Sequence, residues 1–272
     1  MKPSRPVTIA LTIAALLFCY AATLRGMWDQ WMIDEDMGHG VLVPFVVAWV
    51  VWRERARWLA LTPRPTAWGF AMLALGAAFQ VLSLAGAGLF AAALGLVCSV
   101  AGAVLCLGGW PFLRVWSFPL LLALFMLPKL AIVYAQITLP LQLLASRIAA
   151  AMLSLGGVKV VLQGNILDAG GHRIAVEEAC NGVRYLLSLG FTAVVFAYLV
   201  DQRPWMRGAL LLSVVPIAIL ANAARVAASA WLPRLDSGTP HTIAGVCVFL
   251  VCLGAIAFAR VCWSKVWERA HA

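Results

Sequence analysis

Apolar residues along this chain come in long runs that are separated by short polar segments. A helix needs about 20 apolar residues to cross the roughly 30 Å hydrocarbon core of a membrane. The second and fifth candidate runs are short and must borrow flanking residues. The pattern predicts an all-α polytopic membrane protein with about eight transmembrane helices: Val7–Leu24, Gly40–Trp52, Ala67–Leu84, Gly88–Leu107, Val115–Leu127, Gly182–Val200, Met206–Leu232 and Thr242–Trp263.

Composition supports the membrane interpretation. Of the 272 residues, 64% are hydrophobic and only 11% are charged, whereas about a quarter of a soluble domain is charged. Such a chain lacks the polar surface that a soluble domain requires. We therefore expect a single integral membrane domain over residues 1–272 that contacts the lipid bilayer.

The segment 129–178 departs from the pattern of simple spans. Lys129–Gly157 is apolar with helical periodicity, but polar residues and Pro140 interrupt it, so we predict an amphipathic helix, or a helix pair, at the outer face. The next residues alternate apolar and polar positions around Gly170–Gly171, which predicts a small β-hairpin. Whether 129–157 lies at the interface or re-enters the membrane stays open.

The basic residues predict an orientation for eight spans. Both termini then lie on one side, together with twelve basic and three acidic residues, so the whole net charge of +9 falls there. The positive-inside rule makes that side cytoplasmic. The charge is thereby explained by topology, and no nucleic-acid partner is expected. We expect an inner-membrane protein with both termini in the cytoplasm.

Scarce polar groups gather at three predicted span ends on the outer side. Cys180 and Arg184 are i and i+4 at the start of one span, in EEACNGVRY. Asn222 and Arg225 lie near the outer end of the next span, and His241 precedes the last one. Thiol, guanidinium and imidazole groups are therefore expected at a similar depth.

Each of these residues also has a plainer interpretation. Arg184 can act as an interfacial anchor, and Glu178 can mark the membrane boundary or pair with an arginine. Arg225 is harder to explain in this way, because a charge inside a span costs roughly 2.5–3.5 kcal/mol even on the lenient insertion scale. His39, in DMGHGVLVPF, is the main rival of His241 for any histidine role.

A cysteine and a histidine at one site are suited to acyl transfer, with the thiol as nucleophile and the imidazole as proton shuttle. An arginine can stabilise the oxyanion. The sign of the shift in the Cys180 pKa stays open, since the helix start lowers it and the adjacent glutamates raise it. The spacing of the seven cysteines and four histidines matches no metal site, and no cofactor is expected.

The chain resembles the exosortase and archaeosortase family. The resemblance covers most of the chain and is carried by GHGVLVPFVVAWVVWRER, TLPLQLLASRIAAAMLSLGGVKVVLQGNIL, EEACNGVR, ANAAR and the histidine before the last span. Residues 178–184 match in order the family pattern around the cysteine, E-A-C-(S/N)-G-hydrophobic-R. Asn181 stands where serine is commoner in the family.

This resemblance implies a membrane-embedded cysteine transpeptidase that processes C-terminal sorting signals of the Pro-Glu-Pro type on membrane-anchored proteins. The catalytic residues would be Cys180, Arg225 and His241. Such systems commonly accompany exopolysaccharide production in bacteria, and the active site would face the periplasm.

The substrate contacts are hypotheses that rest on charge complementarity and position. Arg184 or Arg173 would hold the glutamate of the signal, and Asn222, Glu178 and His39 are further candidates for substrate binding. The rival functions are a non-enzymatic transporter and a component of polysaccharide-export assembly, in both of which Cys180 would be dispensable. The sequence leaves open the acceptor nucleophile, the recognition motif and the oligomeric state.

Overall fold

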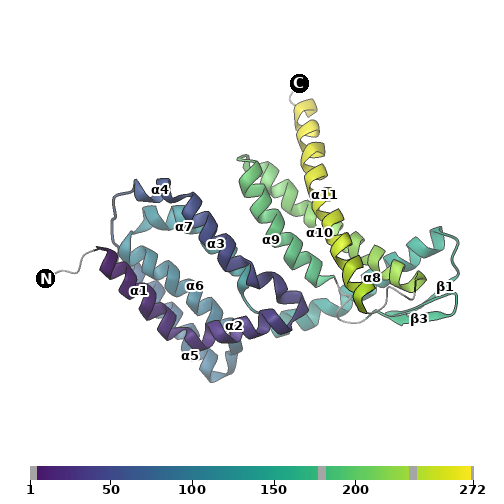
Figure 1. Cartoon of the computed structure of the whole chain (residues 1–272), viewed down its shortest axis with the longest axis horizontal. Helices are drawn as coiled ribbons and strands as arrows, with labels where there is room; N and C mark the ends of the chain where they lie inside the picture. Colours follow the sequence, from purple (N-terminus) through teal and green to yellow (C-terminus); the bar gives the residue numbers. More distant parts are fainter. Residues whose placement is uncertain (1–4, 177–181, 233–237, 271–272) are drawn as a thin grey trace. The chain divides into compact units, whose positions relative to one another are not determined.

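The computed structural model describes residues 5–176, 182–232 and 238–270, and helices make up most of them (Figure 1). The described residues also form one small three-stranded sheet. This architecture confirms the predicted all-α membrane protein. The chain forms two compact units, Met1–Leu130 and Ala131–Ala272, which are described separately below.

The first unit is entirely helical in its described part. Its longest helix is α6, and its shortest elements are single turns at the helix junctions. In chain order the elements are α1 (Arg5–Cys19), α2 (Ala21–Ile33), η1 (Glu35–Val41), α3 (Val43–Arg53), α4 (Arg55–Leu59), α5 (Trp68–Leu82), η2 (Ser83–Ala87), α6 (Gly88–Leu107), α7 (Trp110–Ala123) and η3 (Leu124–Met126).

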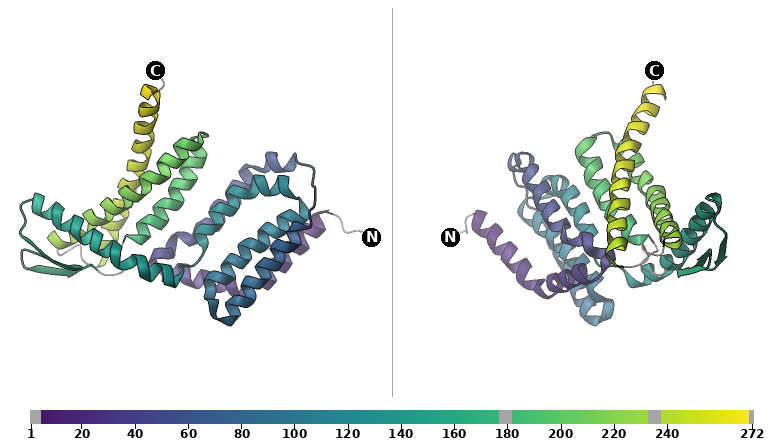
Figure 2. Two further views of the ribbon diagram at one scale, coloured as in Figure 1. Left: turned by 180° about the vertical axis from the view of Figure 1, so that it is seen from behind. Right: turned by 45° about the vertical axis from the view of Figure 1, so that its right-hand side comes forward.

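Helices α5 and α6 form a tight antiparallel hairpin (Figure 2). The chain reverses at Gly86, whose φ of 108° favours glycine. Small residues line the contact, because a Cβ added at Gly102 would lie 2.8 Å from the backbone nitrogen of Leu73. Close approach through glycine is a common way for helices to pack in lipid.

The first predicted span is bent in the structure. Instead of one helix that ends near Leu24, α1 and α2 meet at an angle of 64° near Tyr20. The Tyr20 hydroxyl is buried against the α5–α6 hairpin, 3.1 Å from the carbonyl oxygen of Gly76 and 2.8 Å from Ser99 Oγ. These contacts hold the chain at the bend.

The described part of the second unit comprises four helices and the sheet. Its elements are α8 (Ala131–Leu155), β1 (Val160–Gln163), β2 (Ile166–Ala169), β3 (His172–Ala175), α9 (Val183–Val200), α10 (Pro204–Trp231) and α11 (Gly238–Ala270). A core of buried side chains from α9, α10 and α11, including Leu189, Leu210 and Ile256, joins these three helices.

Helix α8 is a single helix that contains Pro140 and packs against α10 (Figures 1 and 2). Its buried face is polar and small and includes Thr138, Gln142 and Ser146. Its exposed face carries apolar side chains such as Ile132 and Leu139. Several of its polar side chains are thus turned toward the protein, while Gln136 and Arg147 are exposed, and the predicted place of this helix at the outer face stays a prediction.

The predicted β-hairpin is a three-stranded antiparallel sheet in the order β1-β2-β3. The Gly170–Gly171 turn lies where the sequence predicts it, with φ of 66° and 95°. A second turn, at Gly164–Asn165, adds the extra strand, and Gly164 supplies the positive φ of 64° that a two-residue turn needs. Buried residues of the sheet, including Leu167 and Ile174, pack against α8 and α10 together with Val176, which follows β3.

Five helical segments of the described chain are long and apolar enough to cross a membrane, or six if the bent pair α1–α2 is one span. One of the five, Trp68–Leu107, contains both helices of the α5–α6 hairpin and so two predicted spans. Two other predicted spans correspond to the shorter helices α3 and α7. Helix α8 is among the five by length and composition, and its interfacial position stays a prediction.

Candidate active site

The polar end of α9 is placed by a glycine. Gly182 has a φ of 84° and directly precedes α9, where a side chain would be strained. A Cβ at this position would lie 3.2 Å from the side chain of Asn222 on α10. Asn222 is 2% exposed. The backbone that follows the EEACN segment is thereby packed against α10.

Arg225 lies one turn further along α10 and is 6% exposed. Its Nη1 donates a hydrogen bond of 3.5 Å to the hydroxyl of Tyr185 on α9. Its guanidinium carbon lies 5.8 Å from the centre of the Tyr185 ring, which is within the range of a cation–π interaction. The sequence predicts a partner or a function for this buried charge, and Tyr185 is such a partner.

Tyr185 also connects α9 to α11. Its hydroxyl donates to the carbonyl oxygen of Gly245 on α11 at 3.4 Å, so the same oxygen accepts from Arg225 and donates to Gly245. His241 belongs to the first turn of α11, four residues before Gly245. The structure thus joins α9, α10 and α11 through Tyr185, Arg225 and Gly245. The side chain of His241 lies outside the described residues, and its approach to Arg225 stays a prediction.

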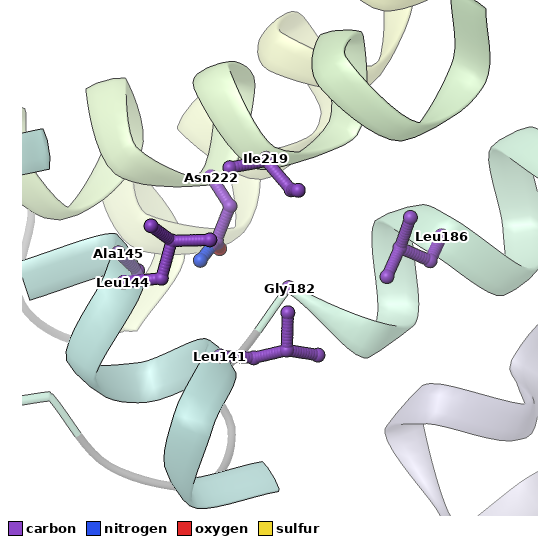
Figure 3. Close-up of a pocket in the computed structure, with 7 residues that line it drawn as sticks. All are labelled: Leu141, Leu144, Ala145, Gly182, Leu186, Ile219 and Asn222. Atoms are coloured by element: carbon purple, nitrogen blue, oxygen red, sulfur yellow. The ribbon is translucent and has the colours of Figure 1, made fainter. Parts of the chain in front are cut away.

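A small pocket adjoins this junction (Figure 3). Its volume is about 10 Å³, which is room for about one water molecule. Asn222 points into it from α10, opposite Gly182 and the side chains of α8. The lining residues come from α8, α9 and α10: Leu141, Leu144, Ala145, Gly182, Leu186, Ile219 and Asn222.

The two arginines predicted to hold the substrate lie in different settings. Arg184 is half-buried in the first turn of α9. Arg173 lies on β3 with its side chain 76% exposed and forms an ion pair of 3.0 Å with Asp168 on β2. The hydrogen bond from Arg173 is the main cause that lowers the pKa of Asp168, and a hydrogen bond from the backbone N–H of Gly171 lowers it further. Any substrate carboxylate at Arg173 would compete with Asp168.

His39 lies in the first unit and is held by η3. Its Nε2 donates to the carbonyl oxygen of Phe125 at 3.1 Å, and its ring is 8% exposed. Burial lowers the pKa of His39 and outweighs the opposing hydrogen bonds, which favours the neutral imidazole. Nearby, Lys129 pairs with Asp34 at 2.8 Å and with Asp36 at 3.0 Å. In the structure these contacts join η1 to the segment after α7.

Two predicted site residues, Cys180 and Glu178, lie outside the described residues. Within the described ranges, no group of three His, Cys, Asp or Glu side chains is placed to hold a metal ion.

Tyr185 is the functional candidate that sequence reasoning missed. It directly follows the family-like EACNGVR segment, and a tyrosine at the start of an apolar span combines an apolar ring with a hydrogen-bonding group. This position in the sequence could have identified Tyr185 as a candidate. Its partners on α10 and α11 are 40 and 60 residues away in the chain, and only tertiary structure brings them together.

No curated protein and no solved structure matches the chain. A family model described as transmembrane exosortase matches residues 28–258. This range includes every candidate site residue discussed above. The chain therefore belongs to the transmembrane exosortase family, a family of membrane transpeptidases.

Proposed function

We propose that this protein is a cysteine-dependent transpeptidase or protease that cleaves C-terminal sorting signals of exported proteins. The observation that carries the proposal is the buried Arg225, which contacts Tyr185 where α9, α10 and α11 meet. A charge in this position is costly unless it has a partner or a task. Gly182, which packs on Asn222 beside it, is separated from Cys180 by one residue in the chain.

In the proposed reaction, the thiol of Cys180 transfers its proton to His241 and the sulfur attacks the carbonyl carbon of the scissile peptide bond. Arg225 stabilises the resulting oxyanion. The tetrahedral intermediate collapses, the C–N bond breaks, and His241 returns the proton to the leaving amine. An amine acceptor or water then attacks the thioester, and its proton restores the thiol as the new product leaves.

Substrate recognition in this proposal uses charge complementarity. Arg184, at the start of α9, binds the glutamate of a Pro-Glu-Pro type signal. Arg173 is a weaker candidate because Asp168 already neutralises it. Asn222, Glu178 and His39 remain proposed substrate contacts.

The proposed setting is the bacterial inner membrane, with both termini in the cytoplasm and the reaction at the periplasmic face. The excess of basic residues on the side of the termini supports this orientation. Residues 1–272 act as one membrane domain, in which 129–178 is an extracytoplasmic insert. The partners are membrane-anchored proteins that carry the sorting signal, and the biological context is export of exopolysaccharide or surface proteins.

The direct test follows a tagged protein with such a signal in cells that carry wild type or Cys180→Ala. We expect the substrate to stay full length with the variant and to be shortened by wild type. Membrane insertion of both forms is measured in parallel. Continued processing by Cys180→Ala would favour the transporter or assembly function instead.

A second comparison tests recognition by Arg184. Arg184→Gln should slow processing of a signal with glutamate more than that of the same signal with glutamine, because only the first loses an ion pair. Equal losses for the two signals would exclude this role of Arg184 and leave the role of Cys180 untouched.

A further inference from the structure

The first unit contains a large apolar cavity that the proposed chemistry does not use. Its volume is about 450 Å³, within the range of 300–1,000 Å³ that is typical of ligand sites. Five α-helices and η3 line it, with residues such as Leu16 on α1, Ala48 on α3, Val100 on α6 and Leu120 on α7. Its wall is almost entirely apolar, so water would find few partners there.

The cavity extends along α3 and borders exposed side chains of α1. Along α3 its wall extends from Pro44 to Val51, which is about 10 Å at 1.5 Å per residue. Ile13 and Leu17 border it and are 53% and 55% exposed. An apolar chain could therefore enter beside these exposed apolar side chains of α1.

One end of the cavity is bounded by aromatic side chains. Trp116 of α7 lines the cavity and packs edge to face with Trp58 of α4, with ring centres 6.4 Å apart. Trp58 Nε1 donates to the carbonyl oxygen of Val51 at 3.0 Å. Tryptophan is enriched at the boundary between lipid tails and head groups, so these contacts indicate where the head-group region begins.

Exposed arginines lie within a few residues of Val51 and Trp116, which line the same end. Arg53 and Arg55 come two and four residues after Val51 and lie over the rings of Trp49 and Trp52, at 5.4 Å and 4.3 Å from the ring centres. Arg114 is exposed on α7, which packs against α3 and α4.

Acidic side chains do little to neutralise the cluster formed by Arg53, Arg55 and Arg114. Glu54 is the only acidic residue between positions 37 and 167 of the sequence, and it forms an ion pair of 2.9 Å with Arg57. The cluster formed by Arg53, Arg55 and Arg114 therefore keeps its positive charge.

We propose that this cavity binds one acyl chain of an anionic phospholipid from the surrounding bilayer, whose phosphate-bearing head group is held by Arg53, Arg55 and Arg114. The apolar cavity and the arginine cluster are independent observations, and they adjoin each other at Val51 and Trp116. Basic clusters between helices on the cytoplasmic side suit anionic head groups. The proposal does not depend on the proposed function of the second unit.

The test uses full-length protein that is purified in detergent, stripped of lipid and titrated with phosphatidylglycerol or phosphatidylcholine of identical acyl chains. Native mass spectrometry counts the bound lipid. We expect one phosphatidylglycerol to be retained, with half-saturation at a concentration roughly tenfold or more below that for phosphatidylcholine. Equal retention of the two lipids by wild type would overturn the head-group assignment.

Charge variants test the arginine cluster. The triple variant Arg53→Gln, Arg55→Gln, Arg114→Gln should lose the preference for phosphatidylglycerol and leave the Arg57–Glu54 pair intact. The matched control removes three positive charges from α11 by Arg260→Gln, Lys265→Gln and Arg269→Gln, and it should keep the preference. Loss of preference in both triple variants would show that net charge, and not this site, selects the lipid.

Cavity-filling variants test the acyl-chain site. Ala48→Phe on α3 and Val100→Phe on α6 fill the cavity from two walls and should each reduce retention of both lipids about tenfold. Ala15→Phe adds the same bulk on α1 away from the cavity and should leave retention unchanged. If either filling variant folds, as judged by circular dichroism and a single chromatographic peak, and still retains lipid as wild type does, the cavity is not the site.

Discussion

Arg225 illustrates how one residue connects sequence to site. Its place after a long apolar run makes it a candidate on the sequence alone, because an unpartnered charge in a span is costly. In the structure it is 6% exposed and contacts the ring and hydroxyl of Tyr185. One tyrosine thereby helps to orient the guanidinium that we propose stabilises the oxyanion.

We expect Arg225→Gln to lower kcat/KM for signal cleavage by about 10²–10³, as loss of an oxyanion donor does. Tyr185→Phe keeps the ring beneath the guanidinium and loses two long hydrogen bonds, one from Arg225 and one to the carbonyl oxygen of Gly245, so it should cost less than about tenfold. Cleavage by equal amounts of inserted protein in liposomes gives the comparison. Similar losses in the two variants would make Arg225 a structural residue.

Asp201 shows a charge with a structural role. It follows α9, is 6% exposed, and forms an ion pair with Arg203 at 3.0 Å. The side chain and backbone N–H of Arg203 lower the pKa of Asp201 from 3.8 to about 2. A lowered pKa in the folded state means that Asp201 contributes stability at neutral pH and loses that contribution as the pH falls through about 4 toward about 2.

Asp201→Asn should therefore lower the free energy of unfolding at pH 7 by about 1–2 kcal/mol. This figure is smaller than the pKa shift alone implies, because solvent screens the half-exposed side chain of Arg203. The difference between wild type and variant should shrink below pH 4. Thermal unfolding in detergent at pH 7 and pH 3 measures both quantities. A difference that is the same at the two pH values would contradict the assigned role of the carboxylate.

At the scale of elements, helix contacts in this protein depend on small residues. A Cβ at Gly76 of α5 would meet Ser99 Oγ and would lie 2.7 Å from the carbonyl oxygen of Gly95 on α6. The Tyr20 hydroxyl at the α1–α2 bend contacts Gly76 and Ser99 as well. The hairpin and the bend therefore depend on the same contact.

Gly76→Ala should destabilise the protein by about 1–3 kcal/mol, because backbone atoms must move apart to admit the methyl group. Gly208→Ala on α10 is the matched control, since nothing lies within 4 Å of its added Cβ, and it should be neutral or stabilising by less than about 1 kcal/mol. Thermal unfolding in detergent compares the two. Equal effects would mean that the hairpin tolerates the methyl group.

At the scale of the whole molecule, the orientation in the membrane depends on α8. With α8 outside the count of spans, we expect both termini and the excess of basic residues in the cytoplasm and the sheet in the periplasm. If α8 crosses, everything after it inverts. Its length and composition permit a crossing, while its buried face is polar and turned toward α10.

We predict that green fluorescent protein fused after Ala272 fluoresces and that alkaline phosphatase inserted after Gly164 is active. Both results follow if α8 does not cross. A phosphatase insertion after Arg64 should be inactive and serves as the control for the cytoplasmic side. Inactive phosphatase at Gly164 together with a dark C-terminal fusion would show that α8 spans the membrane.

Much of the fold was predictable from the sequence because lipid imposes a simple requirement on it. A chain with 64% hydrophobic residues in long runs must satisfy its backbone hydrogen bonds internally, and helices do so within one segment. The Gly170–Gly171 turn was also predictable from local sequence, because glycine readily adopts the positive φ angles of a tight turn. The third strand was missed because Gly164–Asn165 was not recognised as a second two-residue turn.

The family and the candidate residues Cys180, Arg225 and His241 were also apparent in the sequence, since the motif residues lie in short, ordered segments. The local sequence therefore determined the helices, the family and the free-energy cost expected for burying Arg225. Tertiary structure alone decided that α1 and α2 bend at Tyr20, that α8 turns its polar face toward α10, and that Tyr185 joins Arg225 to Gly245. The physical reason is that these features depend on packing between helices distant in the chain, which hydrophobic periodicity within a single helix does not encode.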